Sequence, residues 1–255
     1  MNEKLRVLKI GGSVFHDQFA LPTIAHAIAD ELRADGGGNK VIVVVSAMRH
    51  ATDELLQLLT TERADMKMRD MLLSTGENVA TALVANYLAM ALGLRARGFT
   101  GGQAGIMTDE NFGDANITNV DTAAINEFLK EGDVAVVAGF QGVTKSGDIT
   151  TLGRNGSDTT AFYLAHYFDA GTLTLYKDTN GIYDGNPKVR SDARLYKTLN
   201  YKEVLSGETA GIIHDKALGL CAEMFRNKNP RIIVRNIFSS QNQFTTISKS
   251  PTEFY

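Results

Sequence analysis

Residues 151–161, TLGRNGSDTTA, place a cation, two glycines and a Ser-Asp pair just before a helical pattern. Ser157 or Asp158 stands where a helix N-cap is expected, since apolar residues recur with helical spacing from Ala161 onward. The free N–H groups and positive dipole end of such a helix favour anions. Together with Arg154, this stretch predicts a site for a carboxylate or a phosphate, although an ordinary loop and cap would also explain it.

A second loop that could bind an anion follows the first apolar segment. Residues 5–10 have the pattern of a short buried strand, and Gly11, Gly12 and Ser13 follow it directly. Glycines there let backbone N–H groups approach a ligand, and Lys9 adds a positive charge. The spacing matches neither the P-loop nor the dinucleotide-binding motif, so a phosphate cradle and a plain turn both stay open.

Polar side chains also follow the apolar run 41–45. Ser46 and Thr52 lie beyond its carboxyl end, where open α/β sheets bind their ligands, but either could simply cap the helix expected at 54–59. Glu77 has two interpretations as well. It follows Ser74 with capping-box spacing, and it could equally receive the ammonium group of an amino acid.

A long polar loop follows the apolar segment 172–176. Loops of this length at strand ends are more often functional than idle. An adenine could rest on Tyr183 while Lys177 and Lys188 reach phosphates. Tyr183 could instead pin the loop to the core.

These residues need a sheet to bring them together. An apolar strand at 5–10, a helix at 20–33 and a strand at 41–45 form a right-handed crossover unit, which predicts a parallel α/β sheet with helices on both faces. Further apolar segments extend the pattern: strands at 94–99, 134–138, 172–176 and 232–235, and helices at 79–91, 120–130, 158–168 and 217–225.

Composition excludes several classes of protein. The 255 residues are 44% hydrophobic and 22% charged, as in ordinary globular proteins, and the net charge of -3 argues against a nucleic-acid partner. Cys221 is the only cysteine and lies in an apolar pattern, so it is expected in the core, in a chain without disulfides or a zinc site. With no signal segment and no membrane-spanning run, we expect a cytoplasmic protein.

Taken in order, these loops resemble those of the aspartate kinases, over essentially the whole chain to 246–248. The matching segments are 9–14 (KIGGSV), 45–48 (VSAM) with Thr52, 74–77 (STGE), 103–106 (QAGI), 138–142 (AGFQG) and 151–158 (TLGRNGSD). The resemblance implies the amino-acid kinase fold: a three-layer αβα sandwich around a mainly parallel sheet. It implies a single domain, 1–255, with an amino-acid-binding lobe at about 1–155 and a nucleotide-binding lobe at about 156–248.

The implied reaction transfers the γ-phosphoryl group of MgATP to the β-carboxylate of L-aspartate. By resemblance, Lys9 and Asp158 are catalytic, while Ser46, Thr52, Glu77 and Arg154 bind aspartate. The implied nucleotide and phosphate contacts are Gly11, Gly12, Ser13, Ser157, Lys177, Asp178, Tyr183, Lys188 and Lys216, with Mg²⁺ arriving on the nucleotide and no metal site of the protein's own. A homodimer is the common state of the family.

This chain departs from the family pattern in four places. Lys177 replaces the usual threonine before Asp178, Asn186-Pro187-Lys188 replaces Asp-Pro-Arg, and Asn155 replaces the first glycine of a pair. Gly211, in the segment 209–217, stands where a phosphate-contacting lysine is expected, so Lys177 or Lys216 would have to supply that charge.

The chain also stops about where aspartate kinases continue into regulatory ACT domains, so we expect an enzyme without lysine or threonine feedback. Two alternatives stay open. One is a kinase of the same family with another carboxylate or phosphate acceptor. The other is a binding paralogue with impaired catalysis.

Overall fold

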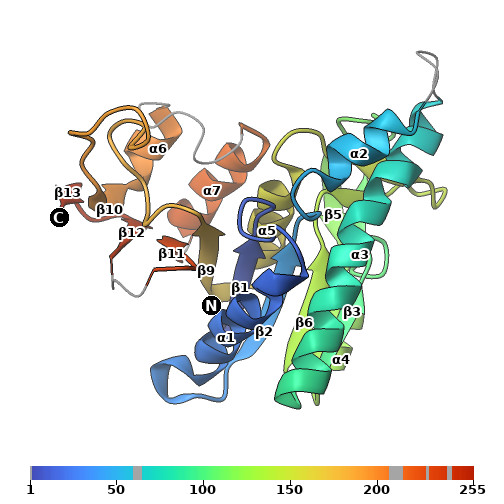
Figure 1. Cartoon of the computed structure of the whole chain (residues 1–255), viewed down its shortest axis with the longest axis horizontal. Helices are drawn as coiled ribbons and strands as arrows, with labels where there is room; N and C mark the ends of the chain where they lie inside the picture. The colour runs from blue at the N-terminus through green and yellow to red at the C-terminus, as the bar shows by residue number, and fades with distance from the viewer. Residues whose placement is uncertain (1, 60–64, 207–214, 228–229, 240–242) are drawn as a thin grey trace.

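A nine-stranded sheet organises the chain, of which the computed structural model describes residues 2–59, 65–206, 215–227, 230–239 and 243–255 (Figure 1). In spatial order the strands are β13 (Glu253–Phe254), β10 (Tyr196–Asn200), β12 (Phe244–Ser248), β11 (Arg231–Asn236), β9 (Ala170–Lys177), β1 (Asn2–Ile10), β2 (Lys40–Val45), β6 (Val134–Ala138) and β3 (Ala96–Phe99). The run from β11 to β3 is parallel, and only the β11–β12 and β10–β13 pairs are antiparallel. The predicted mainly parallel sheet is confirmed.

Helices cover both faces of this sheet, which confirms the three-layer αβα architecture. Alternate residues of one strand pack on opposite layers: Val43 packs with α1 (Leu21–Arg33) and α3 (Met66–Leu92), whereas Val44 packs with α4 (Ala123–Leu129), α5 (Gly156–Tyr167) and α7 (Asp215–Asn227). Two short helices, α2 (Ala51–Gln57) and α6 (Tyr201–Ser206), and two 3₁₀ turns, Gln18–Ala20 and Ala34–Gly36, complete the helical elements that the structure describes.

Cys221 is fully buried among apolar side chains on α7, as expected for a core residue. Burial raises the pKa of its thiol to about 12.

None of the described helices combines the length and the apolarity that a membrane crossing requires.

A second, four-stranded sheet was not predicted. Its strands, in the order β5 (Ile117–Val120), β4 (Ile106–Thr108), β7 (Gln141–Val143) and β8 (Ile149–Thr151), have only three or four residues each. Such short strands carry too little periodicity to stand out in a sequence. This sheet matters because β8 leads directly into the loop before α5.

The predicted helix start near Glu77 is wrong. Helix α3 begins at Met66, after an N-cap at Asp65, so Ser74 and Glu77 lie inside the helix, and the Ser74 hydroxyl donates to the carbonyl of Met71 at 2.8 Å. Gly76 concealed this continuity, because glycine usually weakens a helix. Here a Cβ on residue 76 would lie 3.0 Å from the Ala47 Cβ, so the close approach of α3 to the loop after β2 calls for glycine.

The predicted cap of α5 is also displaced. The N-cap is Asn155, whose backbone is left-handed with φ 56°, and its side chain makes no capping hydrogen bond. Ser157 and Asp158 therefore belong to the first turn of the helix. Both are buried, and both are free of a capping role.

Candidate active site

The loops predicted to bind ligands meet at one edge of the large sheet. Strands β1, β2, β6 and β9 are parallel, and Ile10 pairs in register with both Val45 and Tyr176, so their carboxyl ends lie side by side. The amide of Ser46 donates to the carbonyl of Ile10 at 3.0 Å, and Gly139 donates to Val45 at 3.0 Å. A cavity of about 770 Å³ opens at this edge.

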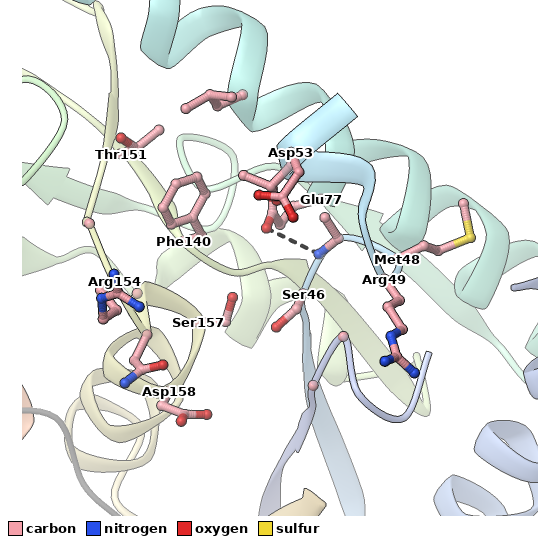
Figure 2. A pocket seen from close by; sticks show the side chains of 18 of the residues that line it. Ser46, Met48, Arg49, Asp53, Glu77, Phe140, Thr151, Arg154, Ser157 and Asp158 are labelled. Atoms are coloured by element: carbon pink, nitrogen blue, oxygen red, sulfur yellow. Dashed lines mark hydrogen bonds between the residues drawn. The ribbon is translucent and has the colours of Figure 1, made fainter. Parts of the chain in front are cut away.

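Most of the predicted site residues line this cavity. They are Lys9, Gly11, Gly12, Ser13, Ser46, Thr52, Glu77, Arg154, Ser157, Asp158 and Lys177. Figure 2 shows Arg154 and Asp158 on one side of the cavity, and Ser46, Arg49 and Glu77 on the other. Segments far apart in the chain therefore form a single pocket.

A buried aspartate bridges two lysines on the floor of the cavity. Lys9 Nζ lies 2.6 Å from Asp158 Oδ1, and Lys177 Nζ donates to Asp158 Oδ2 at 3.1 Å. Lys9 and Asp158 are 7% and 5% exposed, while Lys177 is half-buried. Since one carboxylate stands between two ammonium groups, the cluster has a net positive charge and favours an anion.

Burial and charge act together on this cluster. Burial is the main cause that lowers the pKa of Lys9, and Lys177 lowers it further, while Asp158 opposes both. Burial alone would raise the pKa of Asp158, but the two lysines outweigh it and hold that pKa below its usual value. Asp158 is therefore an anion that orients both lysines.

Glu77 is a second buried carboxylate with a different environment. It is 3% exposed, and its Oε1 accepts the amide of Ala47 at 3.0 Å. Its Oε2 is buried and has no hydrogen-bond partner among the described residues. Burial raises the pKa of Glu77 to about 7, and no cation among the described residues pairs with its carboxylate. A cationic ligand group would fill that place.

Arg154 offers a free guanidinium at the rim. It is exposed, and no hydrogen bond or ion pair joins its side chain to another residue of the described part of the chain. The following residue, Asn155, adopts the left-handed conformation that glycine and asparagine tolerate best. This conformation explains how asparagine can stand where the resembled pattern has glycine.

The loop after β1 is packed against the loop after β2. A Cβ on Gly12 would lie 3.0 Å from the carbonyl oxygen of Ala47, tighter than an ordinary contact. Val14 and Phe15 each donate to the carbonyl of Gly11 at 3.0 Å, which folds the loop back as a tight turn. The glycines thus bring the backbone to the cavity wall above Lys9.

Comparison with known proteins agrees with this geometry. The model of the amino acid kinase family matches residues 4–236. The chain belongs to the amino acid kinase family. The aspartokinase of Geobacillus stearothermophilus is 40% identical over 247 residues, which cover 95% of this chain and 58% of that protein. The aspartokinase of Mycolicibacterium smegmatis is 40% identical over 93% of this chain and 56% of its own length.

A solved structure of this family gives the same result. Aspartate kinase from Synechocystis superposes with a TM-score of 0.78 at 31% identity, over 97% of this chain and 40% of that one. This chain thus spans between two fifths and three fifths of the length of these relatives.

Four residues expected at the family's nucleotide site do not line the cavity. Lys188 Nζ donates to Asp178 Oδ2 at 3.1 Å in the loop after β9, and Tyr183 of the same loop forms a bridge with Leu195. Lys216 Nζ is held elsewhere, 2.6 Å from Asp114 Oδ1 and 3.1 Å from the carbonyl of Leu152. Gly211 lies outside the described residues.

Several lining residues were missed from the sequence. Arg49 and Asp53 lie in the same segment as Ser46 and Thr52, and Phe140 lies in a glycine-containing loop, so proximity in sequence could have indicated them. Thr151 opens the predicted stretch 151–161 but was not chosen as a site residue, because the strand that it ends was not predicted. Arg69 gave less signal, because it precedes the STGE motif on a helix. Phe140 has φ 67°, a strained backbone for a bulky residue and one that is common at functional sites.

Proposed function

We propose that this chain transfers the γ-phosphoryl group of MgATP to the β-carboxylate of L-aspartate, giving 4-phospho-L-aspartate. The observation that carries the proposal is the placement of opposite charges around one cavity. An unpaired buried carboxylate and a free guanidinium suit a zwitterionic amino acid, and a buried cationic cluster suits the phosphoryl group. The 40% identity to aspartokinases supports aspartate as that amino acid.

The amino-acid end of the proposed site uses residues of both halves of the chain. Glu77 Oε2 would accept the ammonium group, and Arg154 would bind the α-carboxylate through two parallel hydrogen bonds. Ser46 and Thr52 would complete the pocket with hydroxyl groups. An ammonium group beside Glu77 would supply the missing partner of the buried Oε2. A charge pair at this buried place contributes more binding free energy than one at the surface.

The phosphoryl end relies on Lys9 and Lys177. Both ammonium groups are held by Asp158, so their positive charge is in place before the reaction begins. Such preorganised charge stabilises a transferring phosphoryl group without reorganisation. Lys177 rather than Lys216 would supply the second cation, because Lys216 Nζ is already engaged by Asp114, Ala115 and Leu152.

No general base is needed, because a β-carboxylate is ionised at neutral pH and attacks directly. Catalysis then depends on alignment and on neutralisation of charge. Gly11, Gly12 and Ser13 would line the path of the phosphoryl group, and Ser157 would lie beside it. No group of three or more His, Cys, Asp or Glu side chains that could hold a metal occurs among the described residues, and Mg²⁺ bound to ATP phosphates needs few protein ligands.

The nucleotide would extend from the cationic cluster toward Asp178, Tyr183 and Lys188, in the lobe at about 156–248, and aspartate would occupy the lobe at about 1–155. A homodimer stays a prediction.

The test is an assay of purified protein with MgATP and L-aspartate, in which hydroxylamine traps the acyl phosphate. We expect hydroxamate formation that depends on both substrates and is lost in Lys9→Met. A panel of other amino acids and phosphate monoesters serves as the control. Hydroxamate from another acceptor alone, or ATP consumption with a phosphate monoester alone, would contradict aspartate as the substrate, and no turnover with any acceptor would contradict catalysis.

A further inference from the structure

Asp70 is a buried carboxylate outside the cavity lining, and the chemistry proposed above does not use it. It lies on α3 with no exposed surface, and no ion pair joins it to a residue of the described ranges. Its Oδ2 accepts the amides of Thr151 at 2.7 Å and Gly113 at 2.8 Å, and its Oδ1 accepts the hydroxyl of Thr151 at 2.8 Å. These three bonds, to a loop and to the end of a strand that are both distant in sequence, satisfy a charge that is costly to bury.

The bonds from Asp70 hold the strand end that leads to Arg154. Thr151 is the last residue of β8, and Arg154 follows within the same short loop before α5. The other side of this loop is held as well, because Lys216 Nζ donates to the carbonyl of Leu152 at 3.1 Å. The guanidinium of Arg154 has no partner among the described residues, so its place depends on the backbone that carries it.

Helix α3 also carries Glu77, about two turns beyond Asp70 and on the same face of the helix. Both side chains are buried: Glu77 reaches the loop after β2, and Asp70 reaches the last residue of β8. One rigid helix thus connects the residue proposed to bind the ammonium group with the loop proposed to bind the α-carboxylate. The two groups of an amino acid are a fixed distance apart, so this spacing matters for binding.

We propose that Asp70 is a positioning residue that sets Arg154 at the correct distance from Glu77 and thereby tunes the site to an α-amino acid. This inference rests on the proposed function and adds a residue that touches neither substrate. Its effect passes through Thr151 to Arg154. Misplacement of a binding group by about an ångström can cost up to roughly a hundredfold in rate.

The experiment is a double-mutant cycle between Asp70→Ala and Arg154→Ala, with KM for aspartate, KM for ATP and kcat measured for each variant. We expect Asp70→Ala to raise KM for aspartate roughly ten- to hundredfold and to leave KM for ATP near wild type. In the Arg154→Ala background the same substitution should add little. Asp70→Asn should restore most of the affinity, because its oxygen can accept both amides while its NH₂ donates to the Thr151 hydroxyl.

A second variant covers the case in which Asp70→Ala does not fold. Thr151→Val removes only the hydroxyl bond to Asp70, so we expect a smaller rise in KM for aspartate that also disappears in the Arg154→Ala background. The matched control is Asp133→Ala, which removes another carboxylate that holds a loop, through the amide of Arg95 at 3.0 Å, away from the cavity. It should lower Tm without changing KM.

Two outcomes would overturn the inference in different ways. If the penalties of Asp70→Ala or Thr151→Val add fully to that of Arg154→Ala, Asp70 supports the fold generally and does not act through Arg154. If calorimetry shows that Arg154→Ala binds aspartate as the wild type does, the proposed aspartate site itself is wrong, and this inference falls with it.

Discussion

Glu77 accepts the amide of Ala47 at 3.0 Å through one oxygen and leaves its other oxygen buried without a partner in the described structure. The bond fixes α3 against the loop after β2, and Glu77 itself lines the cavity. The free protein thus holds a carboxylate that is only half satisfied. Such an arrangement costs stability before the ligand arrives and returns it on binding.

We predict that Glu77→Gln stabilises the free protein and weakens aspartate binding. Burial raises the pKa of Glu77 to about 7 from 4.5, so the folded state binds an extra proton between these values. The free energy of unfolding therefore falls as pH rises through this window, by about 3 kcal/mol for this group. Urea unfolding at pH 5 and pH 8 should show this loss in the wild type and not in Glu77→Gln.

The activity should depend on pH in the opposite sense. A carboxylate is needed to hold the ammonium group, so KM for aspartate should rise as pH falls below about 7 and stay high and flat in Glu77→Gln. Ser74→Ala, one turn earlier on α3, is the control, because it removes only a bond to the Met71 carbonyl. An unchanged KM in Glu77→Gln would contradict its assigned role.

We predict different results for Lys177 and Lys216, the two lysines that could supply the positive charge expected at position 211. Lys177→Met removes a cation that Asp158 holds in the cavity, so kcat should fall roughly a hundredfold with little change in KM for aspartate. Lys216→Met removes a side chain that bonds the carbonyl of Leu152, so it should lower Tm and leave kcat near wild type. Kinetics and thermal unfolding of both variants provide the comparison. The reverse pattern would assign the second cation to Lys216.

The fold was predictable because its central strands are apolar on both faces. The strand at 134–138 has the predicted bounds, and the helix expected at 20–33 begins only one residue later, at Leu21. The strands at one edge of the sheet were harder to predict. Strands β10, β12 and β13 have partly exposed, mixed sequences, so pairing with neighbours rather than local periodicity defines them.

Site residues were predictable where they lie in loops that follow apolar strands. They were not predictable where only tertiary contacts bring them to the site. Lys9 and Arg154 stand in recognisable loops, whereas Arg69 and Asp70 lie on a helix whose start was misplaced by the glycine at position 76. No spacing in the sequence indicates that Asp70 contacts Thr151. Only the packing of the two sheets against α3 shows it.

We predict that Asp158→Asn destabilises the protein as well as abolishing turnover. Without the carboxylate, the buried Lys9 and the half-buried Lys177 become two neighbouring cations with no counter-charge, and removal of one partner of a buried charge cluster costs about 3 kcal/mol or more. The double variant Lys9→Met/Asp158→Asn should regain part of the free energy of unfolding and none of the activity. Urea unfolding and the hydroxamate assay measure the two quantities. Additive losses in the double variant would show that the pair is not coupled.

We predict, finally, that the left-handed backbone at position 155 tolerates asparagine or glycine but not a β-branched residue. Asn155→Gly should leave the free energy of unfolding unchanged or slightly higher, whereas Asn155→Val should lower it by about 1–2 kcal/mol, because a β-branched residue resists φ 56°. Asn155→Val should also raise KM for aspartate, since the strained residue directly follows Arg154 in the chain. Asp169→Val is the matched control, because Asp169 has φ 54° and lies outside the cavity lining. A rise in KM in both valine variants would mean that general destabilisation, and not the place of Arg154, controls aspartate binding.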